Sequence, residues 1–167
     1  MSENTKAQDD VKKSLDDPMS LVDHSVSETY MTELLTKGYV SKNFNLGKSG
    51  LKFSLRTLTS KEDDAIQYYV AKNNVETLQG FSQTGQNLAM SKAVLAVSLT
   101  KLNGEDLIPK IPMSPDTSIE DISKVIEARL LRLNHVGSII IEKLFTTYLR
   151  FTNRVGELLG EADLGEF

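Results

Sequence analysis

One stretch, from Val40 to Glu62, constrains the fold more than any other part of the chain. Two short segments in it alternate apolar and polar residues with a period of two, which is typical of half-buried β-strands, and the letters GKSG join them as a turn. Thr59 and Glu62 then form a capping box, in which each side chain bonds to the backbone N–H of the other residue. The stretch therefore predicts a β-hairpin over about 39–57 that leads directly into a helix.

Helical patterns dominate the sequence around this hairpin. A short helix is predicted over about 27–37, and Gly38 ends it because glycine tolerates positive φ. The helix that follows the capping box is predicted to end near 73–74. A central helix, apolar on nearly all sides, is predicted over 87–100, and the dipeptide at 103–104 closes it as a turn.

The remaining residues predict a connector and two further helices. Residues 105–117 hold three of the four prolines and are predicted to be extended. Thr117 and Glu120 form a second capping box, which opens a helix with apolar residues at every third or fourth position. A last long helix follows a bend near 135–137, and the two helices are either an antiparallel pair or one bent rod. The predicted fold is α+β: an N-terminal β-hairpin packed on a mainly helical body with a long C-terminal helix.

Composition divides the chain into three parts. Residues 1–25 are polar and acidic and are predicted to form a flexible arm, and residues 161–167 to form a frayed acidic tail. Residues 26–160 carry the apolar patterns of a single domain. Residues 31–60 are basic, and three interpretations remain open: the arm lies on the hairpin, the hairpin meets an acidic partner, or both are solvated surfaces.

The overall composition restricts the class of protein. A net charge of −4 argues against a general nucleic-acid binder, which is normally basic. The chain has no cysteine, so it forms no disulfide and fits a reducing compartment. The N-terminus lacks the apolar segment of a signal peptide, and the longest run of large apolar residues, 139–141, is far too short to cross a bilayer. These features predict a protein that is made and works in the cytoplasm, or is carried elsewhere inside an assembly such as a virion tail, with no membrane partner.

No motif in the sequence predicts catalysis. The GKSG turn resembles the end of a phosphate-binding loop, but Lys42 occupies the position of the required first glycine. His24 and His135 are the only histidines, and they have neither zinc-ligand spacing nor a serine elbow that one of them could serve as base. Phe44 and Phe53 lie on the apolar faces of their strands, which favours core over base stacking. We therefore expect no enzyme, no cofactor, no metal site and no nucleic-acid partner.

The last helix carries more apolar surface than one packing contact needs. Its main stripe predicts burial of Ile140, Leu144 and Val155, yet other large apolar residues lie beside that stripe. A helix of this kind commonly has a second partner, either another copy of the chain or a helix of another protein. The predicted partner-binding residues are Ile139, Ile141, Phe145 and Leu149 of this helix and Lys48, Lys52 and Arg56 of the basic hairpin.

The stretch from the hairpin to the capped helix resembles the opening of small tail-assembly proteins of bacteriophages, namely the tail assembly chaperones and the small baseplate-hub assembly proteins of contractile-tailed phages. In those proteins a strand pair ending in a phrase like LRTLT-x-x-E leads into a helical body. The phrase SLTKLNGEDL at 98–107 and the long helical C-terminus fit the same plan, so the resemblance covers about 38–160. The residues that carry it are Leu51, Phe53, Leu55, Arg56, Leu58, Thr59 and Glu62.

Three functions follow from these observations. The resemblance implies a non-enzymatic tail assembly factor that binds tape-measure, hub or tube proteins, as a homo- or hetero-oligomer, in the host cell cytoplasm during assembly. A second hypothesis makes the chain a stable subunit of the virion baseplate, hub or neck. A third makes it a cellular adaptor or regulatory domain whose acidic arm folds on a basic partner.

Overall fold

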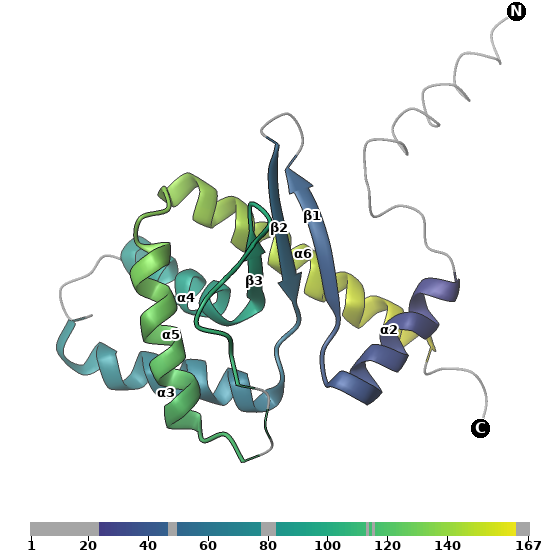
Figure 1. Cartoon of the computed structure of the whole chain (residues 1–167), viewed down its shortest axis with the longest axis horizontal. Coiled ribbons are helices and arrows are strands. Elements are labelled where there is room, and N and C mark those ends of the chain that lie inside the picture. Colours follow the sequence, from purple (N-terminus) through teal and green to yellow (C-terminus); the bar gives the residue numbers. More distant parts are fainter. Residues whose placement is uncertain (1–23, 47–49, 78–82, 113, 115, 163–167) are drawn as a thin grey trace, which may run out of the picture.

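The computed structural model describes residues 24–46, 50–77, 83–112, 114 and 116–162. Figure 1 shows described helices around an antiparallel sheet with the strand order β1-β2-β3-β4, which confirms the predicted α+β class, the hairpin and the long C-terminal helix. In chain order the elements are α2 (His24–Lys37), β1 (Ser41–Leu46), β2 (Leu51–Arg56), α3 (Ser60–Thr77), α4 (Gln83–Ser98), β3 (Leu99–Leu102), β4 (Glu105–Asp106), α5 (Ile119–Leu133) and α6 (Ser138–Ala162).

The predicted arm and tail fall almost entirely outside this description. Only the last two positions of the arm, 24–25, are described, and they begin α2; only the first two positions of the tail, 161–162, are described, and they end α6. The first helix therefore starts three residues earlier than predicted. Its predicted end is confirmed, because Gly38 has φ +77° and its N–H donates to the carbonyl of Leu34.

The predicted hairpin has the predicted faces. β1 pairs antiparallel with β2, and Phe44 lies opposite Phe53 with the two rings stacked at 5.3 Å between centroids. Phe151 of α6 meets the Phe44 ring edge-on at 5.6 Å, so α6 covers the apolar face of the hairpin. Figure 1 shows α6 crossing behind the strands of the sheet. Polar residues, among them Asn43 and Lys52, occupy the other face.

A second hairpin completes the sheet where the sequence predicted helix and connector. α4 ends at Ser98 and β3 begins at the next residue, so the predicted helix over 87–100 is too long at its C-terminus. The turn at Asn103–Gly104 is real, but it joins β3 to β4, and both residues have positive φ as a type I′ turn requires. β3 pairs with β2 with a shift of register near Ser54.

The capping boxes predicted where α3 and α5 begin more accurately than the sequence predicted where α3 ends. The capping box at Thr59 and Glu62 is present, since each side chain accepts the N–H of the other residue. α3 then continues to Thr77, beyond the predicted end. For α5 the N-cap is Ser118 rather than Thr117, and its hydroxyl accepts the N–H of Asp121 at 3.1 Å.

The last two helices adopt neither of the predicted arrangements. α5 packs against α3 and α4, whereas α6 packs against α4 and α2 and under the sheet, with a turn at 134–137 between them. Leu144 and Val155 are buried as predicted. Ile140 was predicted to be buried and is 39% exposed, although it lies on the same side of α6 as the buried Leu144, because it stands in the first turn of the helix, next to the turn that joins α5 to α6.

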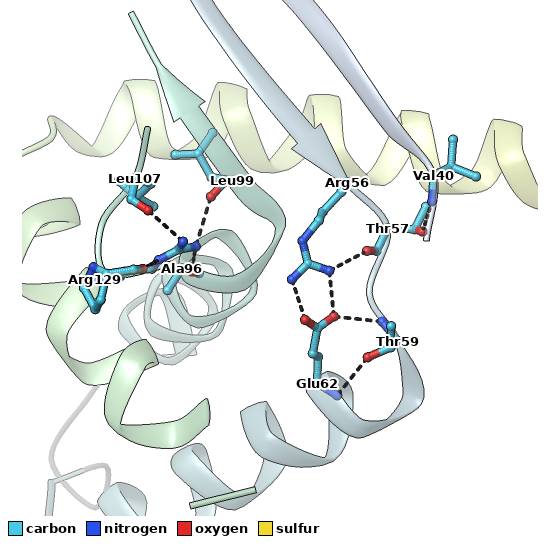
Figure 2. Close-up of polar contacts among 10 residues, drawn as sticks. Val40, Arg56, Thr57, Thr59, Glu62, Ala96, Leu99, Leu107 and Arg129 are labelled. Carbon is cyan, nitrogen blue, oxygen red and sulfur yellow. Dashed lines mark hydrogen bonds and ion pairs between the residues drawn. The ribbon is translucent and has the colours of Figure 1, made fainter. Parts of the chain in front are cut away.

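Arg129 joins three parts of this fold from inside the core. Its side chain is 3% exposed, and Figure 2 shows its guanidinium among backbone carbonyls. It donates to Ala96 at 2.9 Å and Leu99 at 3.2 Å, near the C-terminus of α4, and to Leu107 at 2.7 Å and Pro109 at 2.6 Å in the segment after β4. A cation is favoured at a helix C-terminus, so this side chain fixes α4, β3 and the connector to α5.

Candidate protein-binding surface

The outward side of α6 is the most extended surface that the sequence prediction pointed to. Exposed residues recur along it every three or four positions, which places them on one face of the helix. We call this the α6 outer face, and within the stretch 139–150 it consists of Ile139, Glu142, Lys143, Thr146, Leu149 and Arg150. Ile139 is 67% exposed and Leu149 is 44% exposed, so two large aliphatic side chains face solvent there.

The other two apolar residues predicted for this surface contribute less to it. Ile141 is fully buried, so the structure excludes it from any surface contact in this fold. Consecutive residues on a helix are about 100° apart, and the run 139–141 therefore cannot lie on a single side. Phe145 is half-buried, and its ring stacks on Tyr148 with 6.2 Å between centroids. Phe145 thus borders the outer face rather than standing on it.

Further exposed apolar side chains lie where α5 turns into α6. Leu131 is 66% exposed and lies three residues before the turn that leads to Ile139 and Ile140. Leu131 is not among the predicted partner-binding residues. It lies off the apolar stripe of α5, and a large apolar residue off that stripe is a signal of exposure in the sequence. The amino group of Lys92 on α4 donates to the side-chain oxygen of Asn134 at 2.9 Å, which fixes this corner to the helical body.

The basic residues predicted on the hairpin do not join the α6 surface. Lys52 is exposed, but it lies on the polar face of the sheet, opposite to the face that α6 covers. Lys48 lies outside the described residues. Arg56 is only 4% exposed and is held in an ion pair, so its charge is not displayed to a partner. Lys52 and the exposed α6 residues therefore lie on different sides of the sheet.

Arg56 instead connects the end of β2 to the start of α3. Its Nη1 donates to Glu62 Oε2 at 2.8 Å, its Nη2 donates to Glu62 Oε1, and the Tyr39 ring lies under the guanidinium carbon at 4.9 Å from the centroid. Figure 2 shows the same carboxylate reaching the N–H of Thr59. The phrase that carries the family resemblance thus builds a buried junction between sheet and helix, which is a structural role.

Tyr148 lies near this junction on the buried side of α6. It is 8% exposed, and its burial, together with the nearby carboxylate of Asp63, raises its pKa to about 12 from 10.0. The neutral phenol is therefore favoured by the fold. The contribution of the neutral Tyr148 phenol to the free energy of unfolding is fully present below pH 10 and is lost as the pH rises through about 12.

This pKa gives a prediction for Tyr148→Phe. Between about pH 8 and pH 11 the unmodified chain should lose about 1.4 kcal/mol more unfolding free energy than the variant, because only its unfolded state can ionise at this position in that range. Urea unfolding of both proteins at the two pH values measures the difference. Equal losses in the two proteins would show that the phenol ionises as readily in the folded chain as in the unfolded one.

The described residues contain no group of three or more His, Asp or Glu side chains placed to hold a metal ion. None of the helices in the described ranges has an apolar stretch of the length that a bilayer crossing requires. The α6 outer face therefore stands as the candidate site on its own exposed residues, and it is suited to contact with another macromolecule.

Comparison with known proteins gave no further guide to this surface. No family model matches the chain, and the searches of curated proteins and of solved structures found no match either.

Proposed function

We propose that this chain is a non-enzymatic bacteriophage tail assembly factor that binds helical segments of tape-measure or hub proteins during assembly. One observation carries the proposal: Ile139 and Leu149 stand exposed on the outer side of a long helix whose inner side is firmly packed. The resemblance of the β2–α3 phrase to tail assembly chaperones supplies the class of partner. The protein covers apolar helix surface on that partner until other tail subunits replace it.

The geometry of α6 suits this kind of contact. α6 is anchored by buried residues such as Leu144 and Phe151, so its outer face is held in place before a partner arrives. Burying a side chain of the size of Ile139 or Leu149 is favourable by about 1.5–3 kcal/mol each. Two such anchors, with the neighbouring Ile140 and Leu131, give a contact that holds a partner and can still release it.

Co-expression tests the proposal. The chain is produced together with a bacteriophage tape-measure protein, and the soluble fraction of that partner is measured. We expect the unmodified chain to raise this fraction several-fold and the variant I139S/L149S to lose most of the gain, because the anchors are removed while the buried side of α6 is untouched.

The matched control is Leu35→Ser on α2, a different helix, where the leucine is 80% exposed. It should preserve the gain in partner solubility. No change in partner solubility with the unmodified chain would count against an assembly factor. Mass spectrometry of purified particles then separates the two phage hypotheses, because an assembly factor is absent from the finished tail and a subunit is present in fixed copy number.

A further inference from the structure

The charges on the α6 outer face are arranged by sign. Lys143 and Arg150 are seven residues apart and lie along one edge of the face, about 10 Å from each other along the helix axis. Glu142 lies on the opposite edge, next to Leu149. Ile139 and Thr146 lie between the two edges. The face thus has a basic edge, a central line formed by Ile139 and Thr146, and an opposite edge on which the apolar Leu149 lies beside Glu142.

The basic edge has no counter-charge among the described residues. No ion pair within the described ranges involves Lys143 or Arg150. Glu142 lies on the opposite edge of the face, and Glu157, one turn or more beyond Arg150, is already bound by Arg154 at 2.8 Å. Some exposed lysines elsewhere on the described surface have such partners, as Lys124 has Asp121 and Lys110 has Asp106, whereas Lys52, like Lys143 and Arg150, forms no ion pair with a described residue. The basic edge of α6 is thus available to an acid on a partner.

We infer that the α6 outer face binds an amphipathic helix that carries acidic side chains along one edge of its apolar stripe. This inference rests on the proposed function and names the chemistry of the partner. A helix laid along α6 would place its apolar residues on Ile139 and Leu149, which are about 15 Å apart along the axis. Acids seven residues apart on the partner would then face Lys143 and Arg150.

The charge of the whole molecule makes this edge selective. The chain has a net charge of −4, so an acidic partner is repelled by the molecule as a whole. A helix that meets the basic edge gains local attraction there, which favours one docking position and one direction of the partner. An acid placed opposite Glu142 would be repelled, so the partner carries its acids on one edge only.

Two synthetic helical peptides test the inference with the full chain. Both are about 18 residues long and share one leucine stripe; the first has glutamates seven residues apart along one edge, and the second has lysines at the same positions. Binding is measured by fluorescence anisotropy of the labelled peptides. The acidic peptide should bind about tenfold more tightly than the basic one, and this ratio should fall as salt is added.

Charge-reversal variants locate the effect. K143E/R150E should invert the preference, so that the basic peptide binds more tightly. K52E/K101E, which makes the same change of total charge on the polar face of the sheet, should keep the original preference. I139S/L149S should weaken both peptides about equally, because the apolar anchors are common to them.

The outcomes separate this inference from the proposed function. Equal binding of the two peptides would overturn the acidic partner and leave helix binding intact. An effect of K52E/K101E as large as that of K143E/R150E would show that only total charge matters, which also overturns it. Absence of binding by either peptide would overturn the α6 outer face as the docking surface, whereas the co-expression result tests the assembly function by itself.

Discussion

Arg129→Met is expected to lower the free energy of unfolding by about 3–5 kcal/mol, a large part of the stability of a domain of this size. The methionine fills a similar space but donates no hydrogen bond, so four carbonyls lose their buried donor. Those carbonyls belong to the end of α4, to β3 and to the segment after β4. Urea unfolding followed by circular dichroism measures the change, and β3 with β4 should be the first elements to lose protection from hydrogen exchange.

The reason for this size of effect is that the cation is held by backbone dipoles rather than by an acid. Burial, with a smaller contribution from the charge of Arg56, lowers the pKa of Arg129 to about 10, so the fold already bears the cost of keeping this charge out of water. Arg129→Lys keeps the charge but presents donors from a single point, and it should be destabilised as well. Arg132→Met, one turn later and exposed, is the matched control and should be within about 0.5 kcal/mol of the unmodified chain. A cost for Arg129→Met as small as that of the control would refute the role of the carbonyl cluster.

The parts of the fold that the sequence predicted are those fixed by neighbours along the chain. Alternation at Phe44 and Phe53 specifies a hairpin whichever helix later covers it, and the capping box at Thr59 and Glu62 needs only four residues. Gly38 ended α2 for an equally local reason. Each of these signals acts within a few residues, so no tertiary contact is needed to interpret them.

The second hairpin could not be found from apolar pattern alone. Leu99 and Leu102 continue the apolar run of α4, and in a fully buried run the helical period and the strand period look alike. The dipeptide Asn103–Gly104 was the available signal, because it is the preferred turn of a two-residue β-hairpin. It was interpreted as the end of a helix because β4 is only two residues long and offers no alternation of its own.

The candidate surface was predicted only in part. An excess of apolar residues on the last helix indicated that some must be exposed, and Ile139 and Leu149 are. Which member of the run 139–141 faces inward depends on the phase of α6 against the sheet, and a single sequence does not fix that phase. Arg129 is a different case, since it lies between Ile126 and Leu133 on the buried stripe of α5, and its position there already indicated burial.

Glu62→Gln is expected to destabilise the chain by about 3 kcal/mol, because it leaves the buried guanidinium of Arg56 without a counter-charge. Glutamine has nearly the same shape and retains an oxygen that can accept the N–H of Thr59, so the capping box is largely preserved and the loss reports on the charge. Thermal unfolding of both proteins measures it. The matched control is Glu157→Gln, which breaks the exposed pair with Arg154 and should change stability by less than about 0.5 kcal/mol.

A double replacement decides whether the Arg56–Glu62 pair stabilises the fold or only avoids an isolated charge. Removing both charges in R56M/E62Q should be less destabilising than E62Q alone, because no unpaired ion then remains in the 4% exposed junction between β2 and α3. If the losses of unfolding free energy in R56M and in E62Q simply add up to the loss in the double variant, the two side chains act independently. That result would contradict the bidentate geometry. The expected non-additivity would show that the pair acts as one unit at the junction between β2 and α3, which gives the LRTLT phrase a structural role.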